Sequence, residues 1–313
     1  MTHWRKTDTS PLGLDLHLVV DSPSDSSALL GRNGTPLVTG RALSSYLKLD
    51  LETFSLPVLD VFSGLRCTGR HMQPTSLLAL VSKLRALEYL DVELNHDSDR
   101  KRDVQQRNDF ATGLEQCAET VRVLSLRRPS PTIVPSTGPP KQPWSDFYAS
   151  LRVFSQQCES FEFDDCVDAA QFFTPFIVGP LPNESPNSQE VPFWTRLKRL
   201  NIRNSYLMKE PYLRVTNRID ALAYVQKVLV AVGRASHRMP ELQFARVCQY
   251  ILADGRLEWF VLTYECYAGR AVLRVRGFVP GKVMIGAWRH LVAERRVEFN
   301  IHVEDTDPNA PEL

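Results

Sequence analysis

The sequence predicts an α/β fold built from a repeated helix–strand unit. The segment from Pro74 to Asn95 shows this unit most clearly. Its first half has leucine and valine at helical spacing, and its second half, from Leu87 to Leu94, alternates apolar and acidic residues as a short strand does. Other stretches repeat this spacing, and two strand-like segments joined by a short turn lie near the C-terminus. These observations predict an irregular leucine-rich-repeat solenoid with a mostly parallel sheet and a C-terminal β-hairpin/helix cap.

The repeats share the frame apolar-x-x-apolar-x-apolar. The first of six copies begins at Phe62, and the others follow at intervals of 25, 34, 37, 39 and 45 residues. Only the first interval lies in the usual range of about 20–29 residues, so the others need longer helices or insertions. The copies are Phe62/Leu65/Cys67, Leu87/Leu90/Val92, Val121/Leu124/Leu126, Cys158/Phe161/Phe163, Leu197/Leu200/Ile202 and Leu242/Ala245/Val247.

The remaining elements follow from local patterns. Alternation predicts a strand at Leu14–Val20, and proline-rich stretches predict loops at Pro129–Pro143 and Gly179–Pro192. Helical spacing predicts helices within Asp103–Thr120, Asp146–Gln157, Ile219–Val232 and Val283–Arg296. Two strands, Leu257–Tyr264 and Ala271–Val279, form a hairpin around Ala268-Gly269, and Val297–Val303 is a last strand. We divide the chain into an N-terminal strand and capping segment (1–56), a leucine-rich-repeat-like solenoid (57–250) and a C-terminal β-rich cap (251–313), forming one continuous unit.

Composition narrows the class of protein. The 313 residues are 43% hydrophobic and 23% charged, which is ordinary for a globular chain. A formal charge of +1 steers the protein neither to nucleic acid nor to an anionic membrane, and we expect neither as a partner. No apolar run approaches the roughly 18 residues of a membrane span, and the N-terminus lacks a signal core. The six cysteines have no C-x-x-C spacing, which predicts reduced thiols in a cytoplasmic or nuclear protein.

No motif for catalysis, cofactor binding or metal binding is found, and we expect the protein not to be an enzyme. The densest acidic cluster contains Glu162, Asp164, Asp165 and Asp168. A metal site there is the less favoured interpretation, because the cluster lacks the alternating ligands and turn glycine of a calcium loop. We expect instead that Asp165 or Asp168 caps a helix N-terminus.

A family resemblance adds to this interpretation. The stretches that carry it are LDLHLVVDSPSDS, FSGLRCTGR, SLLALVSKLRALEYLDVEL, DFATGLEQCAETVRVLSL, FYASLRVFSQQCESFEFDD and PFWTRLKRLNIRN, followed by the C-terminal hairpin. Over nearly its whole length the chain resembles the C-terminal leucine-rich-repeat-like region of uncharacterised F-box proteins of filamentous ascomycete fungi. In that family an F-box docks on the adaptor of a cullin ubiquitin ligase, and the leucine-rich part is expected to hold the substrate. No F-box is found before Leu14.

The resemblance implies a protein-interaction module, the substrate-recognition part of an F-box-like ubiquitin ligase receptor. The expected partner is a protein, and the cullin-ligase adaptor is expected only if an F-box lies upstream. The alternative is an orphan leucine-rich scaffold protein without a ubiquitin-ligase role.

The concave strand surface is the expected binding face. Side chains at the fifth and seventh positions of the frame point to it, and eight charged residues become candidates for interaction: Arg66, Asp91, Glu93, Arg127, Glu162, Asp164, Arg203 and Arg246. The seventh-position row alternates in sign from Glu93 to Arg203, and neighbouring strands lie about 4.8 Å apart. We favour a ladder of internal ion pairs, with about 4–6 Å between neighbouring charges, over a recognition patch.

Large aromatic residues could anchor a partner, since tryptophan and tyrosine are enriched at interfaces. The candidates are Trp144, Phe147, Trp194, Trp259 and Trp288, and core packing is favoured for each. Trp144 is the strongest exception, because it follows a proline-rich loop that cannot form core.

Overall fold

The structure, a computed structural model, describes residues 3–5, 13–20, 56–69, 72–94, 100–115, 117, 119–127, 145–164, 166–177, 191–205, 218–253 and 256–304. Its contacts divide the chain into two compact units. Unit 1 comprises Met1–Ser136 and Pro140–Phe154, and unit 2 comprises Thr137–Pro139 and Ser155–Leu313. We describe each unit by itself.

Unit 1 alternates strands and helices. Its elements are β1 (His3–Arg5), β2 (Leu14–Val20), β3 (Phe62–Gly69), α2 (Pro74–Val81), β4 (Tyr89–Glu93), α3 (Arg100–Glu115), β5 (Val123–Arg127) and α4 (Ser145–Ser155), whose last residue belongs to unit 2. The strands lie side by side in sequence order. β1 is antiparallel to β2, and every following pair is parallel. Each parallel connection from β3 to β5 therefore crosses over through a helix.

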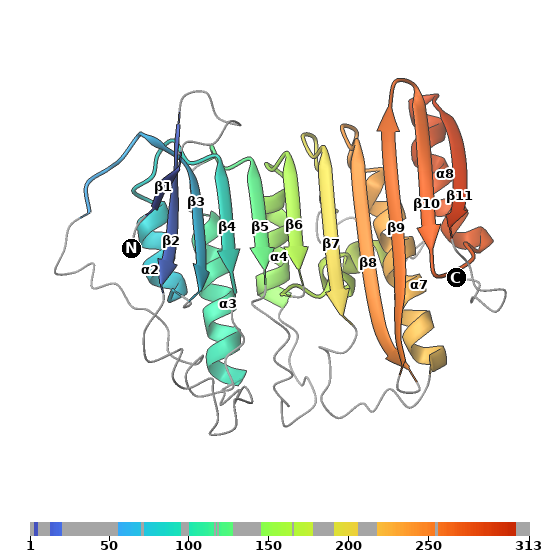
Figure 1. Cartoon of the computed structure of the whole chain (residues 1–313), viewed down its shortest axis with the longest axis horizontal. Coiled ribbons are helices and arrows are strands. Elements are labelled where there is room, and N and C mark those ends of the chain that lie inside the picture. Colours follow the sequence, from blue (N-terminus) through green and yellow to red (C-terminus); the bar gives the residue numbers. More distant parts are fainter. Residues whose placement is uncertain are drawn as a thin grey trace. The chain divides into compact units, whose positions relative to one another are not determined.

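The predicted frame sets the register of unit 1. Leu65, Leu90 and Leu124 are neighbours on β3, β4 and β5, and all three are fully buried. These apolar positions face the helices, which lie behind the strands in Figure 1. Apolar burial contributes roughly 25 cal/mol per Å² of area removed from water. The frame thus positions the strands because one face of each must be covered by a helix.

Unit 2 begins in the same way and then changes pattern. Its elements are β6 (Ser160–Asp164), α5 (Ala169–Phe172), α6 (Thr174–Ile177), β7 (Arg199–Ser205), α7 (Arg218–Ser236), β8 (Phe244–Ala253), β9 (Arg256–Tyr267), β10 (Arg270–Arg276), α8 (Lys282–Arg295) and β11 (Glu298–Glu304). These strands also lie in sequence order. β6, β7 and β8 are parallel, β8 to β10 are antiparallel, and β11 returns parallel to β10.

The core of unit 2 is rich in aromatic residues. Phe161 and Phe163 of β6 pack against Phe172 of α5, with ring centroids 5.3 and 5.7 Å apart. Trp194 is fully buried beside them, and its indole Nε1–H donates a hydrogen bond to Ser155 Oγ at 2.9 Å. That bond satisfies the one polar atom that the indole ring brings into the core.

Local chemistry explains where several elements begin and turn. Proline stands in the first turn of α2, where no N–H is needed. The Asp168 carboxylate accepts hydrogen bonds from the backbone N–H groups of Ala170 and Gln171 and so caps α5, as predicted. Ala268 and Gly269 both have positive φ, which gives the tight β9–β10 turn the twist that antiparallel strands need.

The mixed α/β class and the mostly parallel sheet are confirmed, as are the predicted strands, helices and hairpin on the described residues. β1 was not predicted, because three residues show no alternation. Trp144 and nearly all of both proline-rich loops lie outside the described residues. The core interpretation is confirmed for Phe147, Trp194 and Trp288 and wrong for Trp259, which is 44% exposed.

Candidate interaction face

In each unit, the face of the strands opposite the helices carries the candidate residues. We call it the open face. Within the described ranges no helix covers it, as Figure 1 shows for each unit. Its side chains alternate with the buried core positions, so the third, fifth and seventh residues of the frame lie on it. The question is what those side chains do there.

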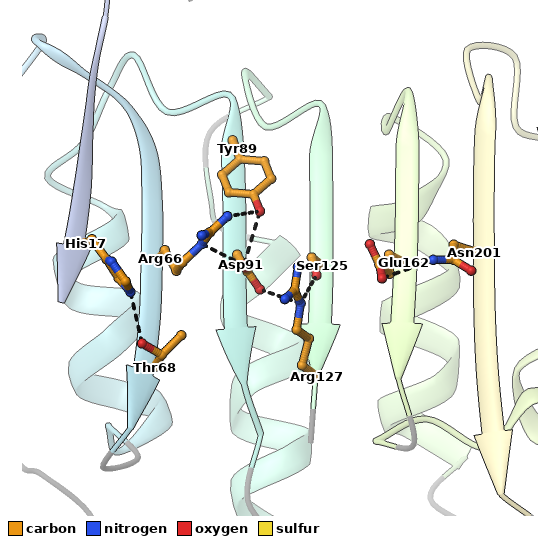
Figure 2. Close-up of polar contacts among 9 residues, drawn as sticks. All are labelled: His17, Arg66, Thr68, Tyr89, Asp91, Ser125, Arg127, Glu162 and Asn201. Carbon is orange, nitrogen blue, oxygen red and sulfur yellow. Dashed lines mark hydrogen bonds and ion pairs between the residues drawn. The ribbon is translucent and has the colours of Figure 1, made fainter. Parts of the chain in front are cut away.

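Asp91 is the centre of the polar network of unit 1 (Figure 2). Its side chain is 1% exposed, although it stands on the open face, because neighbouring side chains cover it. Arg66 Nε lies 2.9 Å from Asp91 Oδ2, and Arg127 Nε lies 3.2 Å from Oδ1. A buried carboxylate needs such partners, since an isolated one costs several kcal/mol.

Tyr89 completes the network on one side. Arg66 Nη2 donates to the Tyr89 hydroxyl at 3.1 Å, and that hydroxyl donates to Asp91 Oδ2 at 3.1 Å. The Arg66 guanidinium also lies over the Tyr89 ring, 5.8 Å from its centroid. The hydrogen bond to Tyr89 raises the pKa of Arg66 further, and burial raises the pKa of Tyr89. The arginine is therefore a fixed cation and the tyrosine a neutral donor at physiological pH.

Arg127 completes the network on the other side. Its Nε–H donates a hydrogen bond to Ser125 Oγ at 3.1 Å. The interaction of Arg127 with Asp91 Oδ1 is therefore an ion pair, and this oxygen accepts no hydrogen bond from any described residue. The Arg127 side chain is 42% exposed and Arg66 is 45% exposed. Two half-exposed cations thus flank one buried anion across three adjacent strands.

A separate side-chain hydrogen bond joins β2 to β3. The imidazole Nε2 of His17 lies 2.9 Å from Thr68 Oγ1 of β3 (Figure 2). His17 stands in register with Arg66, and Arg66 with Asp91. The open face of unit 1 is therefore polar and held by side-chain contacts over four strands.

The open face of unit 2 begins with neutral and charged pairs. Asn201 Nδ2 donates to Glu162 Oε1 at 3.0 Å (Figure 2), and Arg203 Nε lies 3.5 Å from Asp164 Oδ1. Arg203 also lies over the Tyr250 ring, 5.8 Å from its centroid. Both carboxylates at this end of the face therefore have partners, and the partner of Asp164 carries the opposite charge.

At the other end the carboxylates have partners too. Glu265 Oε2 accepts a hydrogen bond of 2.5 Å from Arg274 Nη1, and Glu304 Oε1 lies 3.9 Å from Arg274 Nε. Arg270 pairs with Glu298 at 3.4 Å. These pairs are partly or largely exposed and contribute little stability, about 0–1 kcal/mol each.

Two arginines of unit 2 differ from this pattern. Arg246 and Arg276 are exposed, and neither side chain makes an ion pair or hydrogen bond with a described residue. Arg246 stands between Asn201 of β7 and Thr263 of β9, both uncharged. Both guanidiniums are therefore available, whereas the exposed Arg199 of β7 lies over the Phe244 ring, 5.1 Å from its centroid.

An aromatic pair lies beside them. Tyr250 of β8 and Trp259 of β9 are register neighbours with ring centroids 4.9 Å apart. Trp259 is 44% exposed and Tyr250 is 8% exposed, so the indole covers the phenol. Gly277 has a φ of 87°, and a Cβ there would lie 2.0 Å from the Trp259 carbonyl oxygen. Residue 277 therefore lies closer to the Trp259 backbone than a residue with a side chain could.

The structure brings the predicted residues together as rows. Arg66, Asp91 and Ser125 share one row in unit 1, and Glu162, Asn201 and Arg246 share one in unit 2. The ladder holds for Asp164 with Arg203. Glu93 stands in register with Arg127, but Arg127 Nε contacts Asp91 and Ser125. The Arg127–Asp164 step joins the two units and stays a prediction.

Sequence reasoning missed Tyr89, His17 and the exposed position of Trp259. Tyr89 is the third residue of its frame, which also faces the open side, and only the fifth and seventh were considered. Trp259 directly precedes the buried Phe260, so alternation along β9 could have placed it on the open face.

Other chemistry finds no support in the described part of the chain. No cluster of three or more metal-ligating side chains occurs there. Burial raises the pKa of the Cys67 and Cys158 thiols to about 12, which disfavours thiolate chemistry. No described helix has the length and apolar character needed to span a membrane. The open face presents guanidinium, hydroxyl and aromatic groups.

Comparison with known proteins identifies a family. The sequence model of a family of unknown function, DUF6546, matches residues 110–312, which is more than half of the chain. No curated protein and no solved structure matches the chain at a significant level.

Proposed function

The chain belongs to the family of unknown function DUF6546, and we propose that it is a protein-interaction module that binds its partner on the open face. The observation that carries the proposal is the network around Asp91. Three side chains from three adjacent strands, Arg66, Tyr89 and Arg127, hold a buried carboxylate on a face that no described helix covers.

Such a network favours binding because its side chains are already ordered. Fixing a flexible side chain at an interface costs about 0.5–1.5 kcal/mol, and Arg66 and Arg127 are held before any partner arrives. Both guanidiniums are still about half exposed and keep N–H groups free for a partner's carboxylates or carbonyls.

The proposal includes the fold type. We propose that the helix–strand units form an irregular leucine-rich-repeat solenoid with a β-hairpin/helix cap. The in-register apolar frame of each unit supports this, since every frame residue of β3 to β5 and of β6 to β8 is buried. Solenoids present their strand face as an extended binding surface.

The ubiquitin link rests on sequence resemblance. We propose that the bound protein is a substrate for an F-box-like ligase receptor, and that the chain itself is not an enzyme. The alternative, an orphan scaffold protein without a ligase role, uses the same face. The two differ in whether the adaptor and a cullin accompany the partner.

Site-specific photo-crosslinking tests the proposal. A benzophenone amino acid replaces Val123 or Thr263 in the full chain, and both positions are half-buried on the open face. Each variant is added to an extract of a filamentous fungus and irradiated. Val153 of α4 and Arg289 of α8 provide matched positions, because both are exposed on helices. We expect discrete crosslinked proteins from at least one open-face position and none from the helices. Equal labelling from all four positions would contradict the proposal, and recovery of adaptor and cullin would favour the ligase role.

A further inference from the structure

One part of the open face of unit 2 combines an exposed tryptophan with arginines. We call the set of Arg203, Arg246, Tyr250, Trp259 and Arg276 the arginine–aromatic patch. Arg203 of β7 stands opposite Cys248, two residues from Tyr250, and Arg276 of β10 stands opposite Val261, two residues from Trp259. The aromatic pair therefore has an arginine on each side.

Trp259 has the properties of an anchor. Its indole is 44% exposed yet stacks on Tyr250, and its backbone is backed by the close approach of Gly277. A tryptophan held in one position on a strand offers a large apolar surface at little entropic cost, and tryptophan, tyrosine and arginine dominate interface hot spots.

The charges of this face select the partner. Each carboxylate of the open face of unit 2 already has a hydrogen-bond or ion-pair partner: Glu162 with Asn201, Asp164 with Arg203, Glu265 and Glu304 with Arg274, and Glu298 with Arg270. Arg246 and Arg276 have no such partner among the described residues. The arginine–aromatic patch itself contains three arginines and no carboxylate, so an acidic group is its complement.

We propose that the arginine–aromatic patch binds an acidic peptide segment of the partner protein. In this segment an aromatic or large aliphatic side chain packs on Trp259, and flanking carboxylates pair with Arg276 and Arg246. The inference rests on the proposed function and names the partner's chemistry.

A single-stranded nucleic acid could also stack on a tryptophan, but the patch does not suit a phosphate backbone. Such backbones follow a continuous positive groove. Here Asp164, Glu265 and Glu304 stand on the same face among the arginines and would repel phosphates. An acidic peptide can space its few carboxylates to match two cations.

The test measures binding of the full chain to two probes: a phage library of random 12-residue peptides and a 20-nucleotide oligothymidylate. The expected peptides contain aspartate or glutamate around an aromatic or leucine residue. One synthetic peptide is then measured by fluorescence anisotropy. We expect at least tenfold weaker binding for Trp259→Ala and for Arg276→Glu, and about tenfold for Arg246→Glu.

Matched controls isolate the patch. Tyr267→Ala removes an aromatic side chain that is 59% exposed at the other end of β9, and Arg289→Glu reverses a charge on α8. Neither is expected to change affinity by more than twofold. The two charge variants keep the test valid if Trp259→Ala impairs folding, which far-UV circular dichroism reports.

The outcomes separate the inference from the proposed function. Peptides whose binding survives all three patch variants would overturn the inference and leave the open-face function standing. Failure to enrich any acidic peptide would also overturn the inference. The proposed function is tested separately, by the photo-crosslinking experiment. Binding of oligothymidylate that requires Trp259 would replace the peptide with nucleic acid.

Discussion

The buried carboxylate of Asp91 should stabilise unit 1, and replacing it with asparagine tests this without creating a cavity. Asparagine keeps the shape but removes the charge that faces two guanidiniums at 2.9 and 3.2 Å. It also turns one acceptor into an N–H donor among groups that are mostly donors. The Asp91→Asn variant should therefore fold with reduced stability.

The size of the loss follows from the contacts. A hydrogen bond to a charged group contributes about 1.5–3 kcal/mol, and the bond from the Tyr89 hydroxyl to the Asp91 carboxylate is of this kind. The two arginines are almost half exposed, so water replaces part of their interaction and the charged contribution falls to about half. We expect the free energy of unfolding to fall by about 2 kcal/mol for Asp91→Asn and about 3 kcal/mol for Asp91→Ala.

Urea-induced unfolding followed by far-UV circular dichroism measures the loss. Glu88→Gln is the matched control, because Glu88 is an exposed carboxylate close to the same strand, and its replacement should change stability by less than about 0.5 kcal/mol. Combining Asp91→Asn with Arg127→Met should give a coupling energy of about 1 kcal/mol.

Wild-type stability in Asp91→Asn would refute the reasoning. Such a result would place Asp91 among the buried ion pairs whose desolvation cost equals their attraction. A loss in the Asp91→Asn, Arg127→Met double variant equal to the sum of the single losses would show that the two residues act independently.

Three further predictions concern the core and the backbone. Gln249 is fully buried on β8, and no described residue hydrogen-bonds its amide, so Gln249→Leu should raise the free energy of unfolding by about 1 kcal/mol in urea; a loss of that size would mean that the amide is satisfied. Gly277→Ala should lower the free energy of unfolding by at least about 2 kcal/mol, because residue 277 has a positive φ and a Cβ there would clash with the Trp259 carbonyl oxygen. Gly286→Ala in α8 is the control: the space around Gly286 is open, so this variant should be neutral or stabilising when both variants are compared in thermal melts. Burial raises the pKa of the Cys158 thiol from 9.0 to about 12, so between these pH values the folded chain keeps a proton that the unfolded chain loses. The free energy of unfolding should therefore fall as the pH rises from about 9 to 12. The fall should be smaller in Cys158→Val, and an unchanged pH dependence in that variant would contradict the raised pKa of Cys158.

Much of the fold could be predicted because apolar periodicity reports burial directly. Phe62, Leu124 and Ile202 stand at frame positions, and each is buried against helices. The hairpin turn could be placed because Ala268-Gly269 interrupts two alternating runs, and glycine adopts positive φ most readily. The short β1 could not, since its pairing with β2 and not its own pattern makes it a strand.

The candidate face could be predicted only as rows of residues. Register followed from the frame, so Arg66 next to Asp91 and Asp164 next to Arg203 were expected neighbours. Which cation serves which anion was not predictable. Arg127 lies in register with Glu93, but its Nε reaches Asp91 and Ser125 one row away, because side-chain rotamers choose between neighbours at similar distance.

Apolar spacing along the chain determined which residues face the helices and in what order the strands lie, because burial of one strand face is a local, periodic requirement. Side-chain exposure was decided by the packing of neighbouring strands. Asp91 and Trp259 illustrate this in opposite directions: a charged residue became buried under Tyr89 and two arginines, and an apolar one became exposed over Tyr250. Exposure depends on what lies across two strands, and that information is absent from any single stretch of sequence.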